Sequence, residues 1–141
     1  EADLAPDAQF LSIESLLLGR SAMGETVRTG LFHDRWRIRR DGKLIFADDL
    51  RFEGDVAAQL ATPAVLAGNL ALATILYVGA NAEAFLDPVR HAIRDTGGAS
   101  SWGGKLLIRI AASDGLALRS NVIPALSILM NGQPLPKLWQ L

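Results

Sequence analysis

The 141-residue sequence contains no cysteine, two histidines and one tyrosine. Without cysteine there is no disulfide, no thiolate nucleophile and no cysteine-ligated zinc or iron–sulfur site. The charges also lack a dominant sign, since 14 basic and 15 acidic residues give a net charge of −1. This balance argues against a nucleic-acid binder or a polybasic membrane anchor. Because half of the residues are hydrophobic, the composition also excludes an intrinsically disordered chain.

Long hydrophobic runs are scarce as well. The one candidate for a membrane-spanning segment, from Val56 to Ala82, carries no charge but is interrupted by Pro63, Gly68 and several polar residues. A membrane-spanning helix needs about 20 mostly apolar residues in a row, so this stretch predicts buried strands. There is no signal-peptide pattern, and a first residue Glu1 favours a processed N-terminus or a fragment.

The first part of the chain is predicted to be strands. Alternation over residues 9–18 places Leu11 and Ile13 on one face of a half-buried strand. Asp41-Gly42 is typical of a two-residue hairpin turn. In the simplest register, residues 40, 38 and 36 lie opposite residues 43, 45 and 47. One face would then carry Trp36, Ile38, Ile45 and Ala47, and the other Arg37, Arg39, Leu44 and Phe46.

Further strands are expected at 64–67 and 70–78. After Gly79 the spacing of the apolar residues changes from that of a strand to that of a helix, and helices are expected at roughly 82–96 and 116–131. Because of Pro124, the regular part of the second helix is expected to begin near residue 120. Between them lie a loop at 99–104 and a strand at 105–112. The prediction is one mainly β domain or fragment with α+β content: residues 1–80 mostly strands, residues 81–141 helix–strand–helix with a C-terminal tail.

Groups that could carry chemistry are few. The sequence has no nucleophile elbow and no phosphate-binding loop. His33 is a weak candidate metal ligand, the alternative being a surface histidine. The arginines of residues 35–40 form either cross-strand ion pairs with residues 48–55 or a nucleic-acid patch, and ion pairing is the simpler account. The carboxylates Glu14, Glu25, Glu53 and Asp55 could line a polar cavity or meet a cation.

Five segments, taken in order, resemble the C-terminal half of the UreD (UreH) family of urease accessory proteins, whose members are about twice this length. The resemblance covers almost the whole chain. The segments are Gly-Arg-Ser-Ala-Met-Gly-Glu at 19–25, residues 30–55 ending in Arg-Phe-Glu-Gly-Asp, Ala-Thr-Ile-Leu-Tyr-Val-Gly at 73–79, Leu-Arg at 118–119 with Ile-Pro-Ala-Leu at 123–126, and Leu-Pro-Lys-Leu-Trp at 135–139.

The resemblance implies a fold and a role. The fold would be an elongated β-helix-like stack of strands with two helices in its C-terminal part. The protein would be no enzyme but a cytoplasmic scaffold and metallochaperone of urease maturation. It would bind the urease apoprotein and UreF, which recruits the GTPase UreG. Nickel would pass transiently through an internal tunnel, with no tightly bound cofactor.

The same resemblance suggests candidate residues. Glu25, Glu53 and Asp55 would line the nickel route, although an ion pair with Arg20 is an equal role for Glu25. The glycines of the motifs, with the hairpin turn, would set backbone geometry: Gly19, Gly24, Asp41, Gly42 and Gly54. An apolar helix face with the tail would dock UreF, or else pack on the chain's own sheet: Leu118, Val122, Leu126, Met130 and Trp139.

Two other functions remain open from the residues alone. One is an acid/base hydrolase that uses Glu25 and Glu53, which requires one carboxyl with a raised pKa in a closed cleft. The other is a β-rich interaction module without a metal role. Unpaired strand edges also predict self-association of a fragment.

Overall fold

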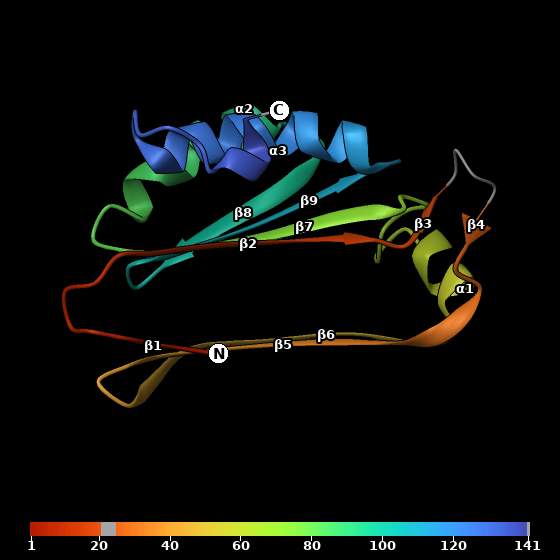
Figure 1. Cartoon of the computed structure of the whole chain (residues 1–141), viewed down its shortest axis with the longest axis horizontal. Helices are drawn as coiled ribbons and strands as arrows, with labels where there is room; N and C mark the ends of the chain where they lie inside the picture. Colours follow the sequence, from red (N-terminus) through yellow and green to blue (C-terminus); the bar gives the residue numbers. More distant parts are fainter. Residues whose placement is uncertain (21–24, 141) are drawn as a thin grey trace.

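The computed structural model describes residues 1–20 and 25–140, except for the side chains of residues 20, 25 and 26. Three layers are visible in Figure 1: helices, a sheet beneath them, and a long hairpin beneath the sheet. The sheet in the middle has four strands. Among the described residues, no helix is long and apolar enough to cross a membrane.

The central layer is an antiparallel sheet in the order β2-β7-β9-β8. Its strands are β2 (Phe10–Leu17), β7 (Ala71–Val78), β9 (Lys105–Ala112) and β8 (Gly97–Trp102). All eight side chains of β7 are buried, because this strand is covered on both faces. The strands expected at 9–18, 70–78 and 105–112 are thus confirmed.

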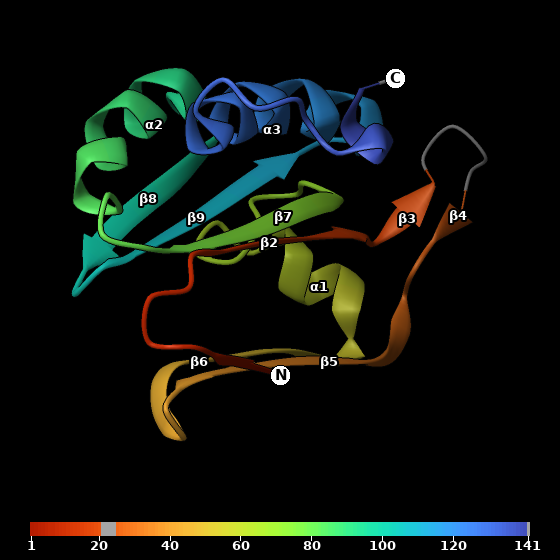
Figure 2. The same cartoon turned by 60° about the vertical axis from the view of Figure 1, so that its left-hand side comes forward.

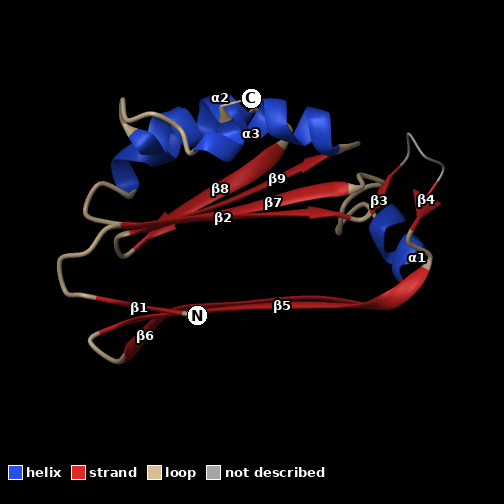
Figure 3. Cartoon of the chain, viewed as in Figure 1, coloured by secondary structure: helices blue, strands red, loops and turns tan. Residues whose placement is uncertain are grey.

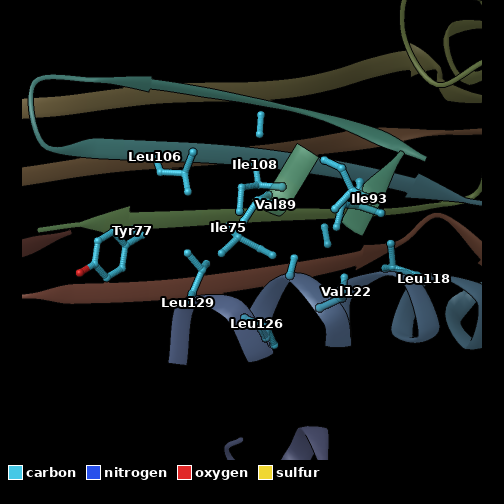
Figure 4. Packing of buried hydrophobic residues seen from close by; sticks show 14 of the residues in the cluster. Ile75, Tyr77, Val89, Ile93, Leu106, Ile108, Leu118, Val122, Leu126 and Leu129 are labelled. Carbon is cyan, nitrogen blue, oxygen red and sulfur yellow. The ribbon is translucent and has the colours of Figure 1, made fainter. Parts of the chain in front are cut away.

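Two helices cover one face of the central sheet (Figure 3). They are α2 (Leu86–Ile93), preceded by the 3-10 turn η2 (Glu83–Phe85), and α3 (Gly115–Met130). Figure 4 shows α3 presenting Val122 and Leu126 toward Ile75 of β7. The helices confirm the period change after Gly79. α3 nevertheless begins at Gly115 and continues through Pro124, since the apolar residues on either side of the proline are held in this core.

The hairpin layer consists of β5 (Thr29–Arg40) and β6 (Lys43–Asp55), with β1 (Ala2–Leu4) parallel to β5. Asp41 and Gly42 have φ of 50° and 69°, which confirms the tight turn. The expected register is wrong beyond it. Arg40 does face Lys43, but a bulge follows, so that Ile38 faces Phe46 rather than Ile45. The bulge turns Phe46 inward, toward the central sheet.

A short helix, α1 (Val56–Ala61), stands between the hairpin and the central sheet at one end (Figure 2). The strand expected at 64–67 is wrong, because residues 63–68 form turns. Val56 and Leu60 of α1 are buried between the layers. The spacing of four between Val56 and Leu60 is compatible with a helix, but the six residues of α1 are too few to give a clear helical pattern in the sequence.

The loop expected at 99–104 is also wrong, since Gly97–Trp102 form the edge strand β8. Its small residues have low strand propensity. A side chain at Gly97 would come within 2.1 Å of the Arg109 carbonyl oxygen, so close pairing requires glycine here. Arg90 of α2 also donates two hydrogen bonds, of 3.1 and 2.9 Å, to the Ala99 carbonyl. Tertiary contacts therefore hold this strand.

The fold is mainly β, as expected, but it consists of two sheets packed face to face. The described residues do not confirm a β-helix-like stack. The remaining elements are the two-stranded β3 (Gly19–Arg20) and β4 (Glu25–Thr26), and the C-terminal 3-10 turn η3 (Lys137–Trp139).

Candidate functional site

The space between the two sheets holds two apolar clusters separated by polar side chains. Phe52, Leu60 and Leu72 belong to the cluster near α1, and Phe46 and Leu76 to the other. Between Leu72 and Leu76, on the same face of β7, lies Thr74, whose side chain is buried. We call the polar residues of this region the polar belt: Glu14, Asp34, Trp36, Asp48, Thr74 and Arg109.

Strand register aligns the belt. Glu14 of β2 and Arg109 of β9 are both direct partners of Thr74, so the three form a row across the central sheet. On the hairpin, Asp34 and Trp36 share the inward face, and Asp48 is the partner of Trp36. Residues far apart in sequence thus meet in one layer.

At one end of the belt, two carboxyl groups from different sheets meet around an indole. Trp36 Nε1 donates to Asp34 Oδ2 and, at 3.2 Å, to Glu14 Oε2. The pKa of Glu14 is raised, first because its carboxyl hydrogen-bonds Asp34 and then because of partial burial; the Trp36 bond opposes the shift. The neighbouring Asp34 carboxyl and partial burial thus both favour the protonated form of Glu14. They line a cavity of about 380 Å³.

At the other end, Arg109 of β9 donates to Asp48 of the hairpin and so joins the two sheets. Asp48 is only 21% exposed, which limits its screening by water. Beyond this pair lies a second cavity, of about 520 Å³, lined by Arg109 and also by Arg51, Gln59 and Leu66. The belt therefore runs between two cavities, with the Glu14 and Asp34 carboxyls at one end and the Arg109–Asp48 pair at the other.

The outer face of the hairpin carries ion pairs, as the simpler account expected. Asp49 accepts from His33 Nε2 at 2.7 Å and from the Arg37 guanidinium at 2.5 Å, with Arg35 Nε at 3.5 Å. These contacts, with Arg37 first and His33 second, lower the pKa of Asp49 to about 2. His33 is therefore held by a hydrogen bond to Asp49. Among the described residues, no group of three histidines or acids is placed to hold a metal ion.

Two of the carboxylates suggested for the nickel route, Glu53 and Asp55, make other contacts. Glu53 is exposed and accepts from Arg51 at 2.6 and 3.1 Å. Asp55 caps α1 by accepting from the Ala58 N–H at 3.0 Å. Arg20 and Glu25 are partners in the β3–β4 ladder, but their side chains lie outside the described residues, as does all of Gly24.

The motif glycines that the structure describes lie at backbone turns and strand ends, and most of the residues proposed to dock UreF are buried. Gly54 has φ of 76°, which favours glycine, and Gly19 begins β3. Leu118, Val122 and Leu126 are almost completely buried against the central sheet, so their side chains serve the chain's own core. Met130 and Trp139 are half-buried, and the Arg119 guanidinium lies 5.6 Å from the Trp139 ring centre.

Sequence reasoning singled out Glu14 but missed the rest of the belt. Two signals were present. Asp34 and Trp36 are two apart in a strand, hence on one face, and Arg109 is a single charge between Ile108 and Ile110. Neither signal shows that the residues meet, because the meeting depends on how the two sheets pack.

Comparison with known proteins gives a consistent result. The family model described as UreD urease accessory protein matches residues 1–140. The chain is 56% identical over its whole length to the urease accessory protein UreD of Rhizobium etli, covering 52% of that protein. The corresponding proteins of Agrobacterium fabrum and Mesorhizobium japonicum are 51% and 46% identical, with 50% and 52% covered.

The chain thus spans about half the length of the curated relatives it matches. The region that the family model matches, residues 1–140, contains the polar belt. The chain belongs to the UreD family of urease accessory proteins.

Proposed function

We propose that this chain acts in urease maturation as a scaffold that binds urease apoprotein and UreF, and reaches the GTPase UreG through UreF. The name of its relatives, urease accessory protein, supports the first part. The partners and a cytoplasmic location come from the resemblance in the sequence. The proposal assigns the chain no catalytic role.

Nickel is the cargo in this proposal, and the polar belt is part of its route. The observation that carries the idea is a polar path between two apolar clusters with a cavity at each end. Carboxylates and water hold Ni²⁺ less tightly than a closed set of imidazoles. A route should release its ion, so weak ligands suit delivery better than a tight site.

The belt suggests how passage is controlled. Because the pKa of Glu14 is raised, Ni²⁺ competes with a proton at this carboxyl, which makes entry more favourable as pH rises. Further inward, the Arg109 guanidinium occupies Asp48. A cation can use Asp48 only after Arg109 leaves it, so this ion pair acts as the barrier between the two cavities.

The partner proposal is tested by capture from defined components. The tagged chain is incubated with purified urease apoprotein and with purified UreF, each alone and together. Retention of at least one is expected. Loss of all retention would contradict the scaffold role, whatever the chain does with nickel.

The nickel proposal is tested by calorimetry. The chain is expected to bind Ni²⁺ with a Kd of about 1 µM or weaker, which corresponds to about −8 kcal/mol or less favourable. Glu14→Gln with Asp34→Asn should weaken that binding, and the matched control Glu53→Gln on the outer face should not. Equal effects of the two changes would contradict the route through the belt, and partner capture with unchanged nickel binding would favour an interaction module.

The Glu14–Asp34 pair also supplies the observation that a carboxylate hydrolase requires, a carboxyl with a raised pKa. It lies at an open rim, however, because Glu14 is exposed. Turnover on a panel of glycosides and esters, abolished by Glu14→Gln, would support this second function. We expect none.

A further inference from the structure

The β2 edge, one of the two edges of the central sheet, has an unpaired backbone ladder among the described residues. β2 is the outermost strand and pairs only with β7. The Leu18 N–H donates to the Leu70 carbonyl on the β7 side. Because N–H directions alternate along a strand, those of Leu11, Ile13, Ser15 and Leu17 point to the open edge. Such a row is a template for a further strand.

Cavities flank this edge on both faces of the sheet. On the helix face, Leu17 of β2, the start of α3 and Leu138 of the C-terminal turn line a groove of about 380 Å³. The side chains of Leu17 and Leu138 are 54% and 73% exposed. Leu116, which follows the groove residue Gly115, is 77% exposed. On the hairpin face lies the cavity of Glu14 and Asp34. The edge thus has a mostly apolar groove, which Arg119 also lines, on one side and a cavity with the Glu14 and Asp34 carboxyls, which Arg35 also lines, on the other.

We propose that the open edge of β2 binds a strand from the half of a UreD polypeptide that residues 1–141 do not match. The relatives have about as much chain outside the matched region as within it. Main-chain hydrogen bonds would supply affinity, and the two cavities would select alternate side chains.

The two sides of the edge predict the character of this strand. Side chains at every second position enter the apolar groove beside Leu17 and Leu138, so these should be aliphatic or aromatic. The intervening side chains face Glu14 and Asp34 and should be polar or cationic. A bound strand covers the rim at Glu14, so it closes one end of the polar belt. The inference rests on the sheet edge and family membership, and it does not depend on nickel passage.

The test mixes this chain with the unmatched half of the Rhizobium etli relative, made as a separate polypeptide. Binding is measured by calorimetry, and amide exchange is followed by mass spectrometry. We expect a complex in which the amides of Ile13, Ser15 and Leu17 become protected.

Two proline variants make the result specific. Ser15→Pro removes an N–H that points to the open edge and leaves the ladder to β7 intact, so binding should weaken by about tenfold or more. Ser101→Pro makes the same change at an outward-pointing N–H of β8, the opposite edge strand, and should leave binding unchanged. Circular dichroism checks that each variant folds.

The inference is wrong if no complex forms, if Ser15→Pro binds as well as the parent chain, or if protection appears at β8 instead of β2. It is also wrong if sedimentation shows that the chain alone dimerises and that Ser15→Pro abolishes the dimer, since a second copy then occupies the edge. If Ser15→Pro does not fold, the amide protection of the parent chain decides the question.

Discussion

The two faces of the central sheet are built on different principles. Toward the helices, the side chains of β7 and β9 are apolar except for the Tyr77 hydroxyl, and they include Ile75, Ile108 and Ile110, none of which has exposed surface. Toward the hairpin, Thr74 and Arg109 interrupt the apolar residues of the same two strands. The first face resembles the interior of any stable domain. The face toward the hairpin contains polar side chains at positions where apolar side chains would stabilise the fold more. This points to a function on that face.

The largest expected effect tests the helix-covered face. Ile108→Ala should lower the free energy of unfolding by about 2–5 kcal/mol, because it leaves a cavity in a closely packed core. Its neighbour Leu107 packs toward the hairpin and is only half-buried. Leu107→Ala should therefore cost less. Urea unfolding of both variants measures the difference, and equal losses would show that the two faces are equally packed.

A smaller effect is expected in the polar belt. Arg109→Met leaves Asp48 partly buried without its cation, which should cost about 1–2 kcal/mol. Adding Asp48→Asn should restore part of that loss, since no charge then lacks a partner. A double-mutant cycle by urea unfolding gives the coupling. Strictly additive losses would mean that the ion pair does not hold the two sheets together.

The hairpin turn should give an effect of about 1 kcal/mol. Gly42→Ala places a side chain at φ of 69°, a conformation that costs about 1 kcal/mol for residues other than glycine. A Cβ at Gly98 of β8 would meet open space, without positive φ, so Gly98→Ala is the control. Thermal unfolding should separate them, and equal melting temperatures would contradict the assigned turn.

The smallest effects are pH-dependent and have opposite signs for Glu14, which faces the inner side of the hairpin, and for Asp49 on the outer side. The pKa of Glu14 is raised, so its stabilising effect is complete below the ordinary value of 4.5 and is lost as pH rises through the folded-state pKa. Glu14→Gln keeps a neutral group at all pH values. It should exceed the parent in stability near neutral pH, by about 0.5 kcal/mol or less because Glu14 is exposed, and match it in acid.

Asp49 should behave in the opposite way. Its pKa is lowered to about 2, so its stabilising effect is complete above the ordinary value of 3.8 and is lost as pH falls through about 2. Asp49→Asn should therefore be less stable than the parent near neutral pH, with a difference that shrinks in acid. Urea unfolding across the acidic range measures both variants. Slopes of the same sign would refute the different environments of the two carboxyls.

Much of the fold was predictable from local pattern. The alternation of residues 9–18, the turn at Asp41-Gly42 and the apolar period of α3 each specified an element that the structure confirms. Local pattern failed for β8 and α1. The small residues of β8 have weak intrinsic preference, and α1 has only six residues; both are held by neighbours distant in sequence.

The sequence by itself determined the family, the mainly β composition and the absence of cysteine chemistry, because these depend on residue identity and short-range order. Only the tertiary structure decided which carboxylates meet. The bulge after Ile38 set which hairpin side chains face inward, and sheet packing brought Glu14 to Asp34 and Arg109 to Asp48. A strand's period assigns each side chain to a face, but which residues lie opposite across two sheets depends on the register and packing of the whole chain.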